Sequence, residues 1–200
     1  MKPDFSFELA AIQNGHTIIC GVDEAGRGPW AGPVVASAVI LDAQNIPVGL
    51  NDSKKLTHEK REALFDPIMK SSYVGIGIVN AAEIDAINIL QATYLAMKRA
   101  VEELGSAPSL ALVDGNRVPP LPCKVETIIK GDGKSLSIAA ASIIAKVTRD
   151  RIMIAMEKQF PDYGFAIHNG YGTAKHAAAL AHLGPCIEHR KSFKPIAALL

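Results

Sequence analysis

The sequence has few of the residues and segments that define several protein classes. Its three cysteines, Cys20, Cys123 and Cys186, show no paired spacing, so neither a disulfide framework nor a zinc site is indicated. We expect them to be small buried side chains. No apolar run approaches the ~20 residues of a membrane span, and residues 1–7 lack the basic-then-apolar pattern of a signal peptide. These absences predict a cytoplasmic protein that does not associate with a membrane.

Low-complexity tracts are also missing, and the composition is that of a folded chain. Hydrophobic residues make up 48% of the 200 residues and charged residues 20%, which excludes disordered, collagen-like and coiled-coil proteins. A chain of this length buries roughly 70% of its unfolded surface in one core. We therefore expect one domain over residues 1–200, with a helical appendage on the same core from about residue 160.

The net charge of +1 hides an uneven distribution along the chain. Residues 1–123 carry 10 Lys and Arg against 14 Asp and Glu, whereas residues 124–200 carry 11 against 6. This asymmetry is compatible with a polyanion-binding face beside an acidic pocket, although uneven surface charge is also common in soluble domains.

Apolar periodicity and turn residues divide the chain into strands and helices. Short β-branched runs predict strands, and longer Ala- and Leu-rich segments with capping signals predict helices. The predicted strands are residues 17–22, 34–41, 73–79, 110–113 and 125–129, and the predicted helices are residues 60–69, 81–104, 138–160 and 173–183. This order predicts an α/β fold with a mixed sheet, in which the first two strands form a hairpin-like pair.

Four acidic residues stand at the ends of these predicted elements. Asp23 and Glu24 follow the first strand, Asp114 follows the fourth, and Asp132 precedes the long helix at residues 138–160. An aspartate at a strand end usually caps a turn. However, if the first and fourth strands are neighbours, the carboxylates converge and require protons or hard divalent cations. Two Mg²⁺ or Mn²⁺ ions roughly 4 Å apart would activate a water and stabilise a leaving phosphate oxygen.

Two other kinds of site compete with this interpretation. Residues 26–31 match the G-x-G-x-x-A dinucleotide fingerprint, but that motif must open a helix, whereas a strand is predicted at residues 34–41. A glycosidase-like carboxylate pair is the second alternative. It ranks lower because lysines such as Lys54 suit a phosphate backbone and the chain has one Trp for stacking on sugars.

Six ordered blocks resemble the ribonuclease HII family, the bacterial type 2 ribonucleases H. The first is Gly21-Val22-Asp23-Glu24-Ala25-Gly26-Arg27-Gly28-Pro29. The others lie at residues 50–56, 113–117, 130–132, 142–150 and 163–171, so the resemblance covers nearly the whole chain.

The resemblance implies a ribonuclease H-like fold with a mixed five-stranded sheet flanked by helices. It also implies a metal-dependent endonuclease that cleaves RNA in RNA–DNA hybrids and 5′ to single ribonucleotides in duplex DNA, leaving 3′-hydroxyl and 5′-phosphate ends. Such an enzyme would use Mn²⁺ or Mg²⁺ and act as a monomer in ribonucleotide excision repair. A nucleic-acid-binding module on the same fold, without catalysis, is the alternative.

The resemblance assigns roles to particular residues. It makes Asp23, Glu24, Asp114 and Asp132 the catalytic, metal-binding carboxylates. The substrate-binding residues would be Gly26, Arg27 and Gly28 at the ribonucleotide 2′-OH, Lys54 at a phosphate, and Tyr171 on the following nucleotide. A glycine loop suits this task because backbone groups can approach the 2′-OH, which distinguishes RNA from DNA.

Some residues depart from the family pattern or have no assigned role. Asn169 stands where a lysine is frequent, and Gly172 stands where a proline is expected. The histidines show no metal-like spacing, so we predict that His168, His176, His182 and His189 are polar surface groups.

Overall fold

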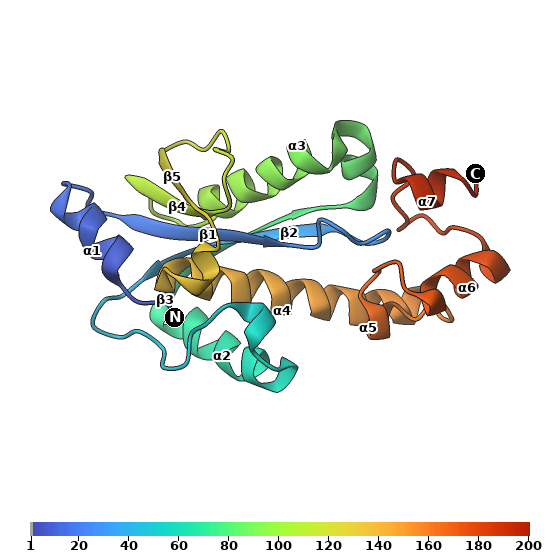
Figure 1. Cartoon of the computed structure of the whole chain (residues 1–200), viewed down its shortest axis with the longest axis horizontal. Coiled ribbons are helices and arrows are strands. Elements are labelled where there is room, and N and C mark those ends of the chain that lie inside the picture. The colour runs from blue at the N-terminus through green and yellow to red at the C-terminus, as the bar shows by residue number, and fades with distance from the viewer. Residues whose placement is uncertain (1) are drawn as a thin grey trace.

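The computed structural model describes residues 2–200 and places a sheet between two layers of helices (Figure 1). The sheet order is β3-β2-β1-β4-β5, with β1 antiparallel to β2 and parallel to β4. The strands are β1 Ile19–Ala25, β2 Val34–Leu41, β3 Ser72–Val79, β4 Leu110–Asp114 and β5 Lys124–Ile128. The mixed five-stranded sheet and the antiparallel first pair are therefore confirmed.

Each face of the sheet is covered by one long helix. Helix α3 (Ala81–Glu102) packs on one face against β2 and β3, and α4 (Leu136–Gln159) packs on the other against β1 and β2. Strand β2 buries side chains on both faces, which explains why its residues, apart from Ser37, are all apolar rather than alternating. The shorter α2 (His58–Ser71) lies beside α4 and begins after Thr57, whose side chain caps it by accepting a hydrogen bond from the Lys60 amide.

Glycines allow both long helices to approach the sheet closely. At Gly75 and Gly77 of β3, a Cβ atom would lie 1.9 Å from the carbonyl oxygens of Ala100 and Ala96 on α3. At Gly21 of β1, a Cβ atom would lie 2.1 Å from the backbone of Ser137, near the start of α4. The start of α4 is therefore seated directly on β1, next to Asp23.

Some elements were not predicted from the sequence. They are α1 Ser6–Gln13, α5 Phe165–His168, α7 Lys194–Ala197 and the 3-10 turns η1 Ser53–Lys55 and η2 Gly131–Gly133. Helix α1 is tied to the start of α4 by the buried Glu8, which accepts hydrogen bonds from Ser135 Oγ and from the Ser137 amide.

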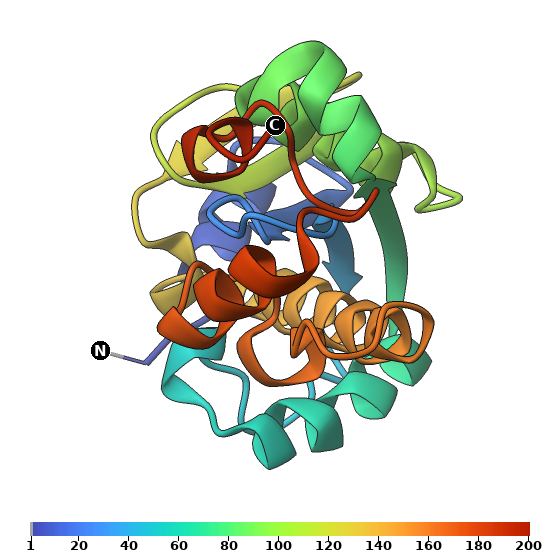
Figure 2. The same cartoon turned by 90° about the vertical axis from the view of Figure 1, so that its right-hand side faces the viewer.

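The last part of the chain covers one end of α4. Helices α5, α6 (Ala174–Leu183) and α7 lie together there, at the right of Figure 1 and facing the viewer in Figure 2. They pack around a small core that includes Met153, Phe165, Leu180 and Ile196. No helix within residues 2–200 has the length and apolar character needed to cross a lipid bilayer.

Two predictions about individual residue types need correction. Cys20 is fully buried as predicted, but Cys123 and Cys186 are half-buried, and all three are free thiols. The prediction of surface histidines holds for His182 but is wrong for His168, His176 and His189, which are 7%, 0% and 0% exposed. These three rings find their partners in one another and in the backbone, a pattern that no local sequence signal reveals.

Candidate active site

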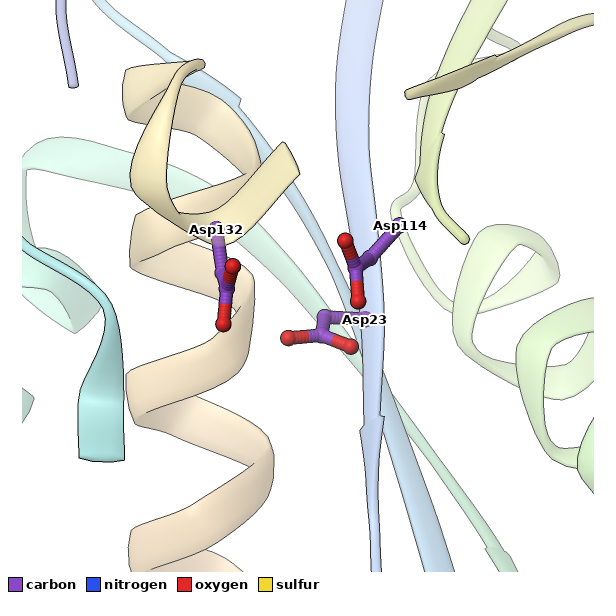
Figure 3. Close-up of side chains that lie close together, drawn as sticks. All are labelled: Asp23, Asp114 and Asp132. Atoms are coloured by element: carbon purple, nitrogen blue, oxygen red, sulfur yellow. The ribbon is translucent and has the colours of Figure 1, made fainter. Parts of the chain in front are cut away.

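Three aspartates from three different elements meet at one edge of the sheet. Asp23 lies on β1, Asp114 is the last residue of β4, and Asp132 lies in η2 just before α4. One carboxylate oxygen from each lies within 4.8 Å of the others. Figure 3 shows the three side chains gathered beside β1. The predicted convergence of these residues is present, with one difference. Strand β1 continues to Ala25, so Asp23 and Glu24 lie in the strand rather than after it.

Local hydrogen bonds fix the positions of these carboxylates. The register places Val22 beside Val113, so the next residue of each strand, Asp23 or Asp114, extends toward the same edge. Asp114 Oδ1 accepts a 2.6 Å hydrogen bond from the Gly131 amide, which connects β4 to the turn that carries Asp132. Asp23 Oδ1 accepts one from the Glu24 amide at 2.7 Å.

The surroundings of the cluster disfavour its negative charge. Burial, together with the charges of Glu24 and Asp114, raises the pKa of Asp23 well above its usual value. Burial and the charge of Asp114 also raise the pKa of Asp132. A bound cation would relieve this repulsion, and a donor set made only of carboxylate oxygens suits a hard divalent ion. The residues present therefore fit a divalent metal site.

Glu24 lies beside this group rather than within it. Its carboxylate accepts a hydrogen bond from Arg27 Nη1 at 3.3 Å, and its side chain is 15% exposed. Burial raises the pKa of Glu24, while the charge of Arg27 opposes that rise. Glu24 lines the same pocket as Asp23.

The predicted substrate-binding residues line this pocket too. Gly26, Arg27 and Gly28 form one wall, and Lys54 and Tyr171 complete it. A Cβ atom at Gly28 would lie 3.7 Å from Cε1 of Tyr171, so the ring faces the glycine loop. Lys54 is 83% exposed at its side chain, and its Nζ lies 3.9 Å from Asp132 Oδ2. Although burial opposes it, the charge of Asp132 holds the pKa of Lys54 above its usual value.

Two buried arginines hold the glycine loop, and sequence analysis missed both. Arg190 donates to the carbonyl oxygens of Gly26, Arg27 and Gly32 at 2.6–3.0 Å. Arg149 donates to those of Ala31, Pro33 and Asn169.

Both guanidinium groups keep their charge inside the protein. Burial lowers the pKa of Arg190 to about 9 and that of Arg149 to about 10, so both remain cations at neutral pH. Within residues 2–200, neither forms a salt bridge with a carboxylate. Their hydrogen-bond partners are backbone carbonyl oxygens of residues 26–33 and of Asn169.

The two departures from the family pattern have local explanations. Gly172 is closely covered by the sole tryptophan, because a Cβ atom there would lie 2.1 Å from the Trp30 ring. Asn169 adopts a left-handed conformation with φ of 51°, which Asn tolerates better than most residues. Its carbonyl oxygen accepts a hydrogen bond from Arg149.

Comparisons with known proteins agree on one family. A sequence model of the family described as Ribonuclease HII matches residues 20–196. Ribonuclease HII of Sinorhizobium fredii is 56% identical over 194 residues, covering 96% of this chain and 84% of the relative. Ribonuclease HII of Jannaschia sp. is 52% identical over 201 residues, covering 100% of this chain and 99% of the relative. The crystal structure of ribonuclease H2 from Pyrococcus horikoshii superposes with a TM-score of 0.76 at 28% identity, covering 92% of this chain and 97% of the other.

Proposed function

This chain belongs to the ribonuclease HII family, and from that premise we propose the finer details of its reaction. The family assignment makes it a type 2 ribonuclease H, a hydrolase that acts on RNA–DNA hybrids. We propose that it is a metal-dependent endonuclease that also cleaves 5′ to a single ribonucleotide in duplex DNA, leaving 3′-hydroxyl and 5′-phosphate ends. We further propose that the protein acts as a monomer in the cytoplasm and that its role there is ribonucleotide excision repair.

One observation carries this proposal. Asp23 and Glu24 line one pocket with the glycine loop and Tyr171, and ligand atoms of Asp114 and Asp132 lie within 4.8 Å of one on Asp23. Groups suited to phosphodiester hydrolysis therefore lie beside groups suited to sugar recognition. Asp23, Asp114 and Asp132 would hold the divalent ions, Mn²⁺ or Mg²⁺, with Glu24 as a further ligand. When bound, these ions supply Lewis acidity for activating water and stabilising the leaving oxygen.

The protein's own groups position the nucleic acid. The backbone of residues 26–28 offers donors and acceptors to the 2′-OH of the ribonucleotide, which DNA lacks. Lys54, with its exposed ammonium group beside Asp132, contacts a backbone phosphate near the cleaved bond. Tyr171 packs against the sugar that follows the ribonucleotide, where a deoxyribose leaves room for the ring.

Cleavage of defined duplexes tests the catalytic proposal. The protein is incubated with a DNA duplex containing one ribonucleotide, in Mg²⁺, in Mn²⁺ and in EDTA, and the product ends are mapped. We expect a single cut 5′ to the ribonucleotide that requires the metal. Asp114→Asn should reduce cleavage by orders of magnitude while retaining duplex binding. A wild-type protein that shifts the duplex in a gel without cutting it would instead be the non-catalytic binding module.

Tyr171→Ala tests whether Tyr171 recognises the junction, the point at which the ribonucleotide is followed by a deoxyribonucleotide. Removal of the ring should reduce cleavage at a single embedded ribonucleotide more than cleavage within a continuous RNA–DNA hybrid, because only the former presents a deoxyribose to the ring. The measurement is kcat/KM on the two substrates in parallel. Equal losses on both would make Tyr171 a general affinity residue.

A further inference from the structure

Behind Tyr171 lies a buried group of three histidines that the proposed reaction does not use. His168 closes α5, His176 lies on α6, and His189 follows α6. The rings of His168 and His176 are stacked with centroids 4.4 Å apart, and His176 Nε2 lies 3.0 Å from His189 Nε2. The group is covered by Trp30 and Phe165.

Backbone groups at the two ends of the His176–His189 pair determine where its protons lie. His176 Nδ1 is 3.0 Å from the Tyr171 carbonyl oxygen, which only accepts, so Nδ1 carries the proton. At the other end, His189 Nδ1 is 2.9 Å from the Cys186 amide, which only donates, so this nitrogen accepts. In neutral rings, His189 Nε2 therefore donates to His176 Nε2. All three hydrogen bonds are satisfied by one arrangement and point in one direction.

The backbone partners of His168 determine its proton position in the same way, and its ring holds the Gly170 amide. Its Nδ1 accepts from the Gly170 amide at 3.1 Å, so its Nε2 donates to the Tyr163 carbonyl oxygen at 2.8 Å. Its own carbonyl oxygen accepts from the Tyr171 amide at 2.9 Å. The backbone of residues 170–171 is thus fixed to imidazole rings or their main chain at three points.

We propose that His176 and His189 are positioning residues, forming a hydrogen-bond relay from the Cys186 amide to the Tyr171 carbonyl that holds the Tyr171 ring over the glycine loop. This inference rests on the proposed role of Tyr171. The Tyr171 ring lies next to Gly28, since a Cβ atom built there would be 3.7 Å from Tyr171 Cε1. A displacement of the Tyr171 backbone would therefore move the ring relative to the proposed 2′-OH site. The relay therefore sets junction discrimination rather than the chemistry at the carboxylates.

The relay works only when both rings are neutral. A second proton on His176 would place two N–H groups face to face, and one on His189 Nδ1 would oppose the Cys186 amide. The titratable or charged groups that face the pair are His168 on α5, Tyr163 before it, Cys186, and Arg190 next in the chain. Burial lowers the pKa of His176, and burial with the nearby His176 lowers that of His189 to about 4.

Histidine NMR tests the relay directly in the intact protein. Long-range ¹H–¹⁵N spectra at pH 7 report which ring nitrogen carries the proton, and His176→Leu and His189→Leu assign the signals. We expect the Nδ1–H form for His176 and the Nε2–H form for His168 and His189. A His176 ring protonated on Nε2, or a doubly protonated ring in the pair, would overturn the relay.

Substrate preference tests whether the relay affects discrimination between the two substrates. The ratio of kcat/KM for the single-ribonucleotide duplex to that for the continuous hybrid should fall about five-fold in His176→Leu, the equivalent of one net hydrogen bond. His189→Gln retains an N–H donor toward His176 and should restore most of the ratio lost in His189→Leu. His182→Leu, at an exposed position on the same helix, is the matched control and should keep the wild-type ratio.

Tyr171→Ala separates failure of this inference from failure of the proposed function. If Tyr171→Ala lowers the ratio and His176→Leu does not, the relay has no positioning role, whereas the junction role of Tyr171 stands. If Tyr171→Ala leaves the ratio unchanged, both proposals fall. If His176→Leu does not fold, the loss of the ratio in His189→Leu and its recovery in His189→Gln decide the positioning role.

Discussion

Asp23 carries a buried carboxyl group whose charge is opposed by its surroundings. Its pKa is raised by burial and by the charges of Glu24 and Asp114. The folded protein therefore binds this proton more tightly than the unfolded chain does. The resulting stabilisation is fully present below the ordinary carboxyl pKa of about 4, and is lost as pH rises through the raised value.

The raised pKa of Asp23 predicts how Asp23→Asn changes the free energy of unfolding in the absence of metal. In EDTA, the variant should be more stable than the wild type at pH 8, and the difference should shrink toward pH 4. Added Mg²⁺ or Mn²⁺ should stabilise the wild type and not the variant. Thermal melts across pH measure this, with Asp66→Asn on the exposed side of α2 as the control. A difference independent of pH would contradict it.

Lys54 is the residue whose charge we expect nucleic acid to use most directly. Each phosphate contact made by a lysine contributes about 0.9 to the slope of log K against log salt concentration. Lys54→Ala should lower the slope for duplex binding by that amount, measured with Asp114→Asn as background so that no cleavage occurs. Lys70→Ala is the control, because Lys70 precedes β3 at the opposite end of the sheet from Asp23. An unchanged slope would place Lys54 away from the phosphates.

At the scale of elements, the loop between β1 and β2 is fixed by cations rather than by its own hydrogen bonds. In Arg190→Lys, a single ammonium group replaces the planar guanidinium and cannot bond the carbonyl oxygens of Gly26, Arg27 and Gly32 together. Buried acceptors therefore lose their hydrogen-bond partners. Urea unfolding should show a loss of at least about 2 kcal/mol. Arg151→Lys, at an exposed ion pair with Glu62, should change stability by less than about 1 kcal/mol. Equal losses would remove any special role for Arg190.

How far the sequence predicts these elements depends on how local their signals are. The strands and long helices were predicted because their apolar periods extend over many residues. Helices α5 and α7 have four residues each, which is too short for a 3.6-residue period to be recognised. The carboxylates were predicted because they stand at or near the ends of the predicted elements and match the motifs of the family. The buried arginines were not, because their partners lie in distant loops, as with Arg190 and Gly26. The buried histidines have partners only 2–13 positions away, but at irregular spacings that match no recognised motif.

At the scale of the whole molecule, α4 connects regions that are far apart. Its first half packs on β1 and β2, and Met153 and Met156 in its second half belong to the core around α5, α6 and α7. We expect the sheet and the last helices to unfold as one unit, as predicted for a single domain over residues 1–200. Calorimetric and van't Hoff enthalpies should agree, and fluorescence of Trp30 should follow the same transition as far-UV circular dichroism. An earlier Trp30 transition would show that the last helices unfold separately.

The glycine loop is held by Arg190, a residue that is synthesised close to the end of the chain. A ribosome adds roughly 5–20 residues each second, so Arg190 is synthesised roughly 3–12 s after Asp132 completes the set of carboxylates. Until Arg190 has been synthesised, the loop carbonyls of Gly26 and Arg27 lack the cation that holds them. The loop suited to recognising a ribose is therefore completed only when nearly the whole chain has been synthesised.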